Sequence, residues 1–202
     1  MIVIVDYGVG NLNSVRNMLL HVGAKAKVSS EPADIEGAQK LILPGVGHFD
    51  HGMRKLRSSG LIDPLECAVL KHKVPILGIC LGAQILGRKS EEGTELGLGW
   101  LNMECRKFPD TMGLPVPHMS WNSLVHRRKS RFFSLELQDS RYYFVHSYFM
   151  HCDSEDDVVS DCDYGVRFSA VVGRDNITGM QFHPEKSLKY GMAVMKNFNE
   201  NY

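Results

Sequence analysis

The residues best suited to chemistry are one cysteine and, far from it in the chain, a histidine followed by a glutamate. Cys80 ends the apolar run 74–79, which predicts a buried strand, and it lies between Gly78 and Gly82. This spacing is typical of a nucleophile elbow, a strand-to-helix turn where flanking side chains would collide with a neighbouring strand or helix. A helix start favours the thiolate, so we expect Cys80 to be a nucleophile rather than a buried structural cysteine.

The second candidate group follows the predicted strand 177–182. His183 is followed by Pro184, which blocks helix continuation, and by Glu185 two residues on. This spacing lets the imidazole and the carboxylate contact each other. The imidazole would take the thiol proton and return it to a leaving amine, while the carboxylate would fix the ring tautomer. A lone pair of this kind can also be structural or part of a metal site.

Two further segments could hold a dinucleotide or a metal. A turn after the strand 2–5 resembles a dinucleotide fingerprint, but Asn13 stands where the third glycine belongs. His151, Cys152 and Cys162 include potential metal ligands but no paired Cys-x-x-Cys, and no further ligands stand at metal spacing around the histidine–glutamate pair. We therefore predict neither a cofactor nor a metal.

A glycine-rich loop at 44–47 follows the predicted strand 40–43. Glycines at a strand end allow backbone amides to point into a cleft. If this loop lies beside the elbow, the amide of Val46 or Gly47, together with that of Leu81, would hold a developing oxyanion. One such donor changes a rate by about two to three orders of magnitude. An ordinary tight turn is the alternative interpretation.

The elements that must position these groups alternate between strand and helix in the first half of the chain. Predicted strands are 2–5, 26–28, 40–43 and 74–79, and predicted helices are 12–22, 64–69 and 81–86. After residue 100 strands dominate, at 100–106, 114–116, 142–148, 170–173 and 177–182. We predict an α/β fold with a mostly parallel central sheet flanked by helices and an antiparallel extension. No flexible linker divides the chain, so 1–202 is predicted to be a single domain.

Composition restricts the partners and the compartment. The 202 residues include 23 basic and 23 acidic side chains, so the net charge gives no reason to expect nucleic acid or an anionic membrane. No apolar run approaches the roughly 18 residues that span a bilayer, and the amino-terminal segment does not resemble a signal peptide. The five cysteines lack paired spacing, which fits a reducing compartment. We predict a cytoplasmic protein.

Three separated segments together resemble the class I (triad) glutamine amidotransferases. They are PGVG at 44–47, GICLGAQ at 78–84 and QFHPEK at 181–186. Further segments narrow the resemblance to the glutaminase subunits of imidazole glycerol phosphate synthases, over essentially the whole chain: DYGVGN at 6–11, PHMSWN at 117–122 and FVHSY at 144–148. The resemblance implies that Cys80 attacks the side-chain amide of glutamine and releases ammonia, with His183 as general acid and base and Glu185 orienting it.

The resemblance also implies binding roles. Gln84 and Glu92 match positions that recognise the amino-acid end of glutamine, and Ser147 contributes through its backbone. Without the resemblance, an acidic residue after the elbow helix would be interpreted as solvated surface. Ammonia would pass to a (βα)8-barrel cyclase partner in histidine biosynthesis. The residues that match partner-facing positions are Asn11, Asn13, Trp121, Tyr143 and Lys186.

Three departures from the family pattern concern the partner rather than the chemistry. Ala83 stands where methionine is usual, Ser120 where glycine is usual, and 87–89 carries a basic pair. A paralogous branch feeds ammonia to a sugar amidotransferase in surface-polysaccharide biosynthesis, and this is the alternative function. A silent binding subunit and a γ-glutamyl hydrolase or peptidase are further alternatives. Since free glutamine hydrolysis would waste ammonia, we expect the Val46 amide to be misaligned until the partner and its ligand bind.

Overall fold

The computed structural model describes residues 1–133 and 140–202. Its strands are β1 (Ile2–Val5), β2 (Ala26–Ser29), β3 (Lys40–Gly45), β4 (Ile76–Cys80), β5 (Lys89–Ser90), β6 (Met103–Lys107), β7 (His118–Ser123), β8 (Val125–His126), β9 (Arg141–His146), β10 (Tyr148–Cys152), β11 (Val158–Asp163), β12 (Arg167–Arg174) and β13 (Ile177–Met180). Its helices are α1 (Leu12–His21), α2 (Pro32–Glu36), α3 (Phe49–Ser58), α4 (Ile62–Glu66), α5 (Leu81–Ile85) and α6 (Leu188–Asn201), with the helical turns η1 (Cys67–Lys71), η2 (Asp110–Met112), η4 (Glu155–Asp157) and η5 (Pro184–Lys186).

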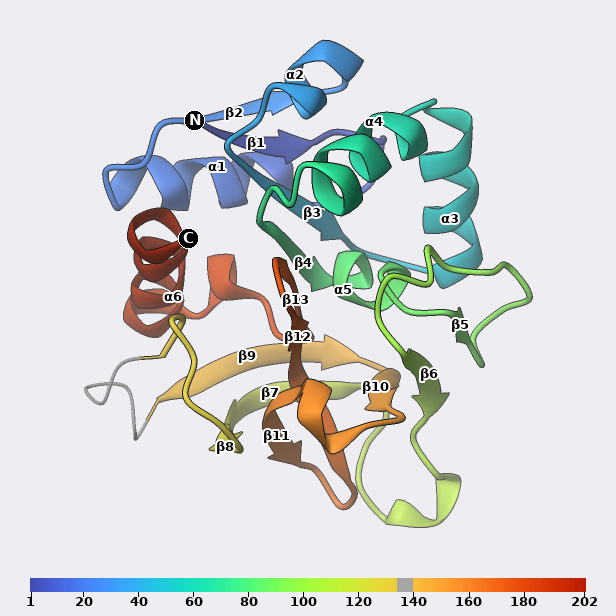
Figure 1. The fold of residues 1–202 in the computed structure, drawn as a ribbon. Coiled ribbons are helices and arrows are strands. Elements are labelled where there is room, and N and C mark those ends of the chain that lie inside the picture. The colour runs from blue at the N-terminus through green and yellow to red at the C-terminus, as the bar shows by residue number, and fades with distance from the viewer. Residues whose placement is uncertain (134–139) are drawn as a thin grey trace.

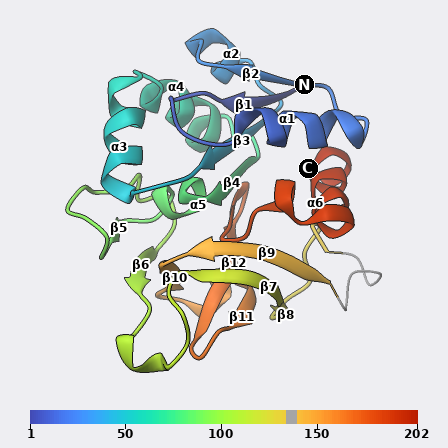
Figure 2. The same ribbon diagram turned by 180° about the vertical axis from the view of Figure 1, so that it is seen from behind.

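A mixed sheet runs through the molecule with helices on both faces (Figures 1 and 2). Within the described residues its strand order is β2-β1-β3-β4-β13-β12-β10-β6-β5, with β11 beside β12 and β8 beside β11. The strands from β2 to β13 are parallel neighbours, and β13, β12, β10 and β6 pair antiparallel in turn. β7 and β9 form a separate antiparallel pair. The predicted parallel sheet with an antiparallel extension is confirmed.

The alternation of side chains along β1 explains how one strand builds two cores. Val3 and Val5 belong to the apolar cluster that contains the buried faces of α3 and α4. Ile2 and Ile4 point the opposite way, into the cluster that contains the buried faces of α1 and α6. All four side chains are almost fully buried, and burying one such side chain stabilises a fold by about 1.5–3 kcal/mol. This is why the run reads as continuously apolar.

The register of three neighbouring strands positions the candidate site. β4 lies between β3 and β13, with Gly45 opposite Cys80 on one side and Met180 opposite Ile79 on the other. Because the three strands are parallel, the segments that follow them emerge at the same edge of the sheet. The glycine loop, the elbow and His183 are therefore neighbours in space although they are far apart in sequence.

Two predicted strands are corrected by the structure. Residues 114–116 are irregular rather than extended, because Pro115 and Pro117 have no amide hydrogen to give to a sheet. The predicted strand 142–148 is divided into β9, which pairs with β7, and β10, which joins the main sheet. Ser147 lies between them, so the residue expected to present its backbone to glutamine sits where the chain changes sheets.

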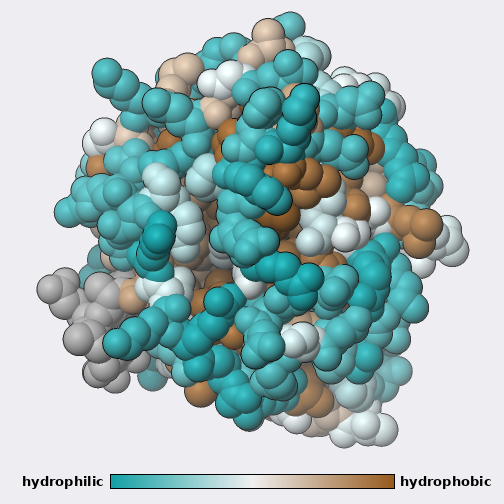
Figure 3. Space-filling model, in the orientation of Figure 1, coloured by the Kyte–Doolittle hydropathy of each residue, from teal (hydrophilic) through white to brown (hydrophobic). Residues whose placement is uncertain are grey.

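No helix in the described parts of the chain is both long and apolar enough to cross a membrane. The longest described helix, α6, has 14 residues. Hydrophilic residues cover most of the face shown in Figure 3, where hydrophobic residues appear in small patches.

Candidate active site

The elbow at the end of β4 depends on two glycines. Cys80 has a φ of 53°, a strained value for a residue with a side chain, and α5 begins at the next residue. A Cβ on Gly82 would lie 1.8 Å from the carbonyl oxygen of Leu43 in β3. A Cβ on Gly78 would lie 2.7 Å from Cα of Ala83 in α5. The predicted collisions are therefore found, one with a strand and one with a helix.

The sulfur of Cys80 is buried beside a polar side chain that follows β13. The residue is 7% exposed, and Nε2 of the fully buried Gln181 donates a hydrogen bond to its Sγ at 3.8 Å. Tyr7 is also buried nearby and donates its hydroxyl hydrogen to the carbonyl of Pro44. Burial, and then the charge of Cys80, raise the pKa of Tyr7 well above its ordinary value. The sulfur therefore accepts a hydrogen bond from one buried amide, that of Gln181.

His183 and Glu185 contact each other as their spacing predicts. Nδ1 of His183 lies 2.8 Å from Oε1 of Glu185, and both side chains are 2% exposed. An ionised carboxylate only accepts, so the hydrogen on this bond belongs to Nδ1. Nε2 of His183 is buried and has no hydrogen-bond partner among the described residues. It is the ring nitrogen left for proton transfer.

The surroundings of His183 favour its protonated form. Burial by itself lowers the pKa of the imidazole, but the neighbouring Cys80 and Glu185 side chains raise it more strongly, to about 10. Cys80 at the elbow is therefore close enough to His183 to affect the protonation of its ring. At neutral pH this arrangement holds a proton on the ring, beside the sulfur.

Backbone contacts fix the position of His183. Its amide donates to the carbonyl of Tyr143 in β9 at 2.9 Å. The hydroxyl of Ser187 donates to the carbonyl of His183 at 2.7 Å and accepts from the amide of Tyr143 at 3.0 Å. The turn η5 is therefore tied to β9, the strand that leads to Ser147.

A cavity of about 240 Å³ opens on these groups. Nine of the residues predicted from the sequence line it: Val46, Gly47, Cys80, Leu81, Gln84, Glu92, Ser147, His183 and Lys186. Glu185 is not in the lining, which fits a group that contacts the imidazole rather than a ligand. Val145, His146 and Tyr148 complete the wall.

The two side chains expected to recognise glutamine are held by protein hydrogen bonds. Nε2 of Gln84 donates to the carbonyl of Tyr148 at 3.0 Å and to Oε1 of Gln181 at 3.1 Å. Oε2 of Glu92 accepts from the amide of Phe49, the first residue of α3, at 2.8 Å. Glu92 is only partly exposed and lines the cavity.

The loop proposed for the oxyanion lies against the elbow. Val46 and Gly47 come directly after Gly45, the register partner of Cys80. Gly47 has a φ of 90°, a conformation open to glycine at little cost. Val46 is 41% exposed although it lines the cavity, so the loop forms part of the mouth.

Three of the residues predicted to face a partner are adjacent. Trp121 and Tyr143 are cross-strand partners in β7 and β9, with ring centroids 6.0 Å apart. Nζ of Lys186 lies 5.8 Å from the centroid of the Tyr143 ring. Asn11 and Asn13 lie at the start of α1, which contacts η5. Of these residues, Lys186 also lines the cavity.

Sequence reasoning missed several groups around the cavity. Gln181 belongs to the segment QFHPEK that carries the resemblance, but the sequence assigns it no role, although an isolated amide in a largely apolar run is a signal. His146 accepts a hydrogen bond from His118, since its Nδ1 hydrogen goes to the carbonyl of Tyr148. Burial lowers the pKa of His118 to about 4, and burial is also the main reason that the pKa of His146 falls to about 3. Both imidazoles are therefore neutral near pH 7.

The residues that depart from the family pattern each have a defined place in the structure. Ala83 packs closely against Gly179 of β13, where a Cβ would approach to 3.0 Å. Arg88 forms an ion pair with Asp153, and Lys89 forms one with Glu104. Ser120 lies in β7 opposite Phe144.

Among the described residues, no three His, Cys, Asp or Glu side chains are grouped as metal ligands would be.

Comparison with known proteins agrees with this arrangement. The family model for class I glutamine amidotransferases matches residues 3–201. Imidazole glycerol phosphate synthase subunit HisH 2 of Pseudomonas aeruginosa is 53% identical over 200 residues, 99% of both chains. The subunit of the same name from Methanococcus maripaludis is 45% identical over 198 residues, 98% of both chains.

A solved structure described as a glutamine amidotransferase shares the fold. It has a TM-score of 0.75 at 21% identity and covers 97% of this chain, which in turn covers 96% of that one. From the family model, the full-length relatives and the shared fold, we conclude that the chain belongs to the class I glutamine amidotransferases.

Proposed function

We propose that this chain is the glutaminase subunit of an imidazole glycerol phosphate synthase, with residues 1–202 acting as one glutaminase domain. The observation that carries the proposal is the cavity in which Cys80 and His183 meet the residues expected to hold glutamine. Relatives named as subunits of this synthase match nearly the whole chain. Glutamine is hydrolysed to glutamate and ammonia, and the ammonia is used by a partner subunit.

In the first half of the reaction, the sulfur of Cys80 attacks the side-chain amide carbon of glutamine. The carbonyl oxygen becomes an oxyanion, for which we assign the backbone amides of Val46 or Gly47 and of Leu81 as donors. His183 then gives its Nε2 proton to the amide nitrogen. Ammonia leaves, and a γ-glutamyl thioester remains on Cys80.

In the second half, water replaces the ammonia. His183, now neutral at Nε2, takes a proton from the water as it attacks the thioester carbon. The sulfur of Cys80 leaves and glutamate is released. Glu185 stabilises the imidazolium throughout by accepting the Nδ1 hydrogen, a bond that also fixes the tautomer.

Recognition of the amino-acid end of glutamine falls to Gln84, Glu92 and the backbone of Ser147. The carboxylate of Glu92 suits an ammonium group, and its bond to the amide of Phe49 holds one oxygen in place. The Oε1 atom of Gln84 is left for a ligand, because its Nε2 is used within the protein. The bond between His146 and Tyr148 supports the turn at Ser147.

We propose that a (βα)8-barrel cyclase covers this end of the molecule as the partner of a heterodimer. The predicted contact residues are Asn11, Asn13, Trp121, Tyr143 and Lys186. Exposed apolar side chains in β7 support the assignment, since Met119 is 59% exposed and Trp121 is 40% exposed. A glutaminase that works beside its cyclase is expected in the cytoplasm.

Two measurements test the proposal. A γ-glutamyl electrophile, 6-diazo-5-oxo-norleucine, should label Cys80 and no other cysteine, as read by peptide mass spectrometry; an unlabelled Cys80 would mean a catalytically silent subunit. Glutamine hydrolysis should then rise at least about tenfold when the cyclase and its ligand are added. A rise with a sugar amidotransferase instead of the cyclase would replace the histidine-pathway assignment with the polysaccharide one.

A further inference from the structure

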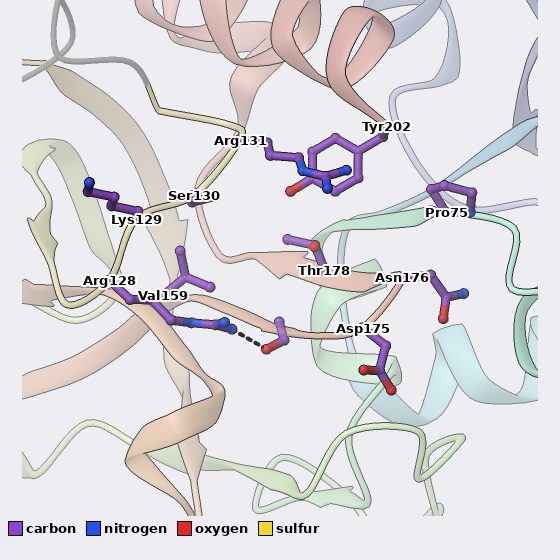
Figure 4. Close-up of a pocket in the computed structure, with 11 residues that line it drawn as sticks. Pro75, Arg128, Lys129, Ser130, Arg131, Val159, Asp175, Asn176, Thr178 and Tyr202 are labelled. Carbon is purple, nitrogen blue, oxygen red and sulfur yellow. Dashed lines mark hydrogen bonds between the residues drawn. The ribbon is translucent and has the colours of Figure 1, made fainter.

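A second cavity lies at the edge of the sheet opposite the active site. Its volume is about 390 Å³, and Figure 4 shows the residues that surround it. Pro75 precedes β4 and Thr178 lies near the start of β13, whereas Cys80 and His183 stand at the other ends of these two parallel strands. With a rise of about 3.3 Å per residue, the two cavities are separated by roughly 15 Å of sheet.

Three cationic side chains line this cavity, all from the segment that follows β8. They are Arg128, Lys129 and Arg131. None of them forms an ion pair with a carboxylate of the described residues, whereas the adjacent Arg127 pairs with both Glu155 and Asp161. None of these three cations is therefore paired directly with a described carboxylate, although Asp175 also lines the cavity.

The two guanidinium groups are held in place by neutral acceptors. Arg128 donates through Nη2 to the carbonyl of Gly173, the bond drawn as a dashed line in Figure 4. Arg131 donates through Nη1 to the carbonyl of Asn201 at 3.1 Å, and its guanidinium lies 5.7 Å from the centroid of the Tyr202 ring. Each guanidinium has five N–H donors, so these bonds fix its position and leave donors for a ligand.

Hydroxyl and carboxylate groups complete the lining. Thr178 is 6% exposed, and Ser130 and Asp175 also line the cavity. The charged side chains of the lining are thus three positive and one negative, and Asp175 can accept hydrogen bonds from hydroxyl groups. The volume falls within the usual range of about 300–1,000 Å³ for small-molecule sites.

We propose that this cavity binds a phosphorylated sugar. Arg128 and Arg131 hold the phosphate oxygens, a geometry that suits the planar fork of a guanidinium. Lys129 adds charge, and Asp175 accepts from the sugar hydroxyls. A solvated basic surface would not explain why both arginines are anchored to backbone carbonyls around a cavity. An extended polyanion would be repelled by the carboxylate of Asp175.

The test is titration calorimetry of the unaltered chain with glucose 6-phosphate, glucose and inorganic phosphate. We expect saturable binding of glucose 6-phosphate, weaker binding of phosphate, and a dissociation constant for glucose at least about tenfold higher. Raising the salt concentration should weaken the binding of glucose 6-phosphate and of inorganic phosphate and leave the binding of glucose unchanged. Absence of saturable binding of glucose 6-phosphate up to about 10 mM would overturn the proposal, as would equal affinity for glucose.

Variants locate the site. The double variant R128Q/R131Q should raise the dissociation constant for glucose 6-phosphate at least about tenfold, and Lys129→Gln, which breaks no described contact, about threefold. The matched control is Arg16→Gln, an exposed arginine in α1, which should leave binding unchanged. Thermal unfolding checks that each variant is folded. Unchanged binding in both cavity variants, or an equal loss in Arg16→Gln, would place any bound sugar phosphate elsewhere and contradict the assignment.

Discussion

Nδ1 of His183 and Oε1 of Glu185 lie 2.8 Å apart in a setting where both side chains are almost completely buried. Burial opposes a charged imidazole, yet Glu185 and Cys80 raise the pKa of His183 to about 10. An unfolded chain has a histidine pKa of about 6.5. The folded state therefore binds this proton more tightly than the unfolded state does.

This pKa shift predicts how stability changes with pH. Because the folded pKa is raised, the contribution of His183 to the free energy of unfolding is complete below about pH 6.5 and is lost as the pH rises towards 10. Glu185→Gln should lower the pKa of His183 and reduce this loss, by an amount on the order of 2 kcal/mol between pH 6.5 and 9.5. Urea unfolding of both proteins at several pH values measures it. Identical pH profiles would show that Glu185 does not stabilise the imidazolium.

The elbow glycines predict a second effect on stability. Gly82→Ala should destabilise the fold by about 3 kcal/mol or more, because its Cβ would meet the backbone of Leu43 at 1.8 Å. Gly60→Ala is the matched control, since its φ is 72° but nothing lies within 4 Å of its Cβ, and it should cost about 1–2 kcal/mol. Urea unfolding compares the two. Equal losses of unfolding free energy in the two variants would mean that the close contact between Gly82 and Leu43 is not what requires a glycine at the elbow.

Much of the fold was predictable because local sequence and tertiary packing agree in the first half of the chain. The run Ile2–Val5 is apolar on both faces, and both faces are buried between helices. In the second half, single residues override the pattern. Pro115 and Pro117 remove donors from a segment of otherwise extended character, and Ser147 divides one apolar run between two sheets.

The candidate site was predictable where the local chain dictates the geometry. Gly82 and Cys80 define the elbow, and the proline-containing turn sets the contact between His183 and Glu185. Gln181 and His146 were missed because their contacts come from residues distant in the chain, and no local spacing encodes such contacts.

Gln181 is predicted to support both the nucleophile and the binding site. Gln181→Leu removes the hydrogen bond to Sγ of Cys80 and the acceptor for Nε2 of Gln84. Leucine has a similar volume, so we expect a folded protein with kcat/KM for glutamine reduced about tenfold or more. Steady-state kinetics with the partner present measures it, and thermal unfolding reports on the fold. An unchanged kcat/KM would mean that Gln181 supports neither the nucleophile nor the binding site.

The partner-facing surface gives a prediction about assembly. Trp121→Ala should weaken binding of the cyclase by about 2 kcal/mol, or roughly thirtyfold, because exposed aromatic residues often dominate interfaces. Val125→Ala is a suitable control, since Val125 is 54% exposed in the short strand β8 and belongs to no predicted contact. Analytical titration of the two subunits separates the variants. Equal affinities for both would indicate that the partner docks elsewhere.

The most direct test of the account uses Cys80→Ala with two nitrogen sources. Removing the sulfur should abolish glutamine-dependent turnover of the assembled synthase, because no thioester can form. Turnover with an added ammonium salt should be preserved within about twofold, because the partner then receives ammonia without hydrolysis. Glutamine-dependent turnover that persists in Cys80→Ala would contradict the mechanism in which attack by this sulfur on glutamine releases the ammonia.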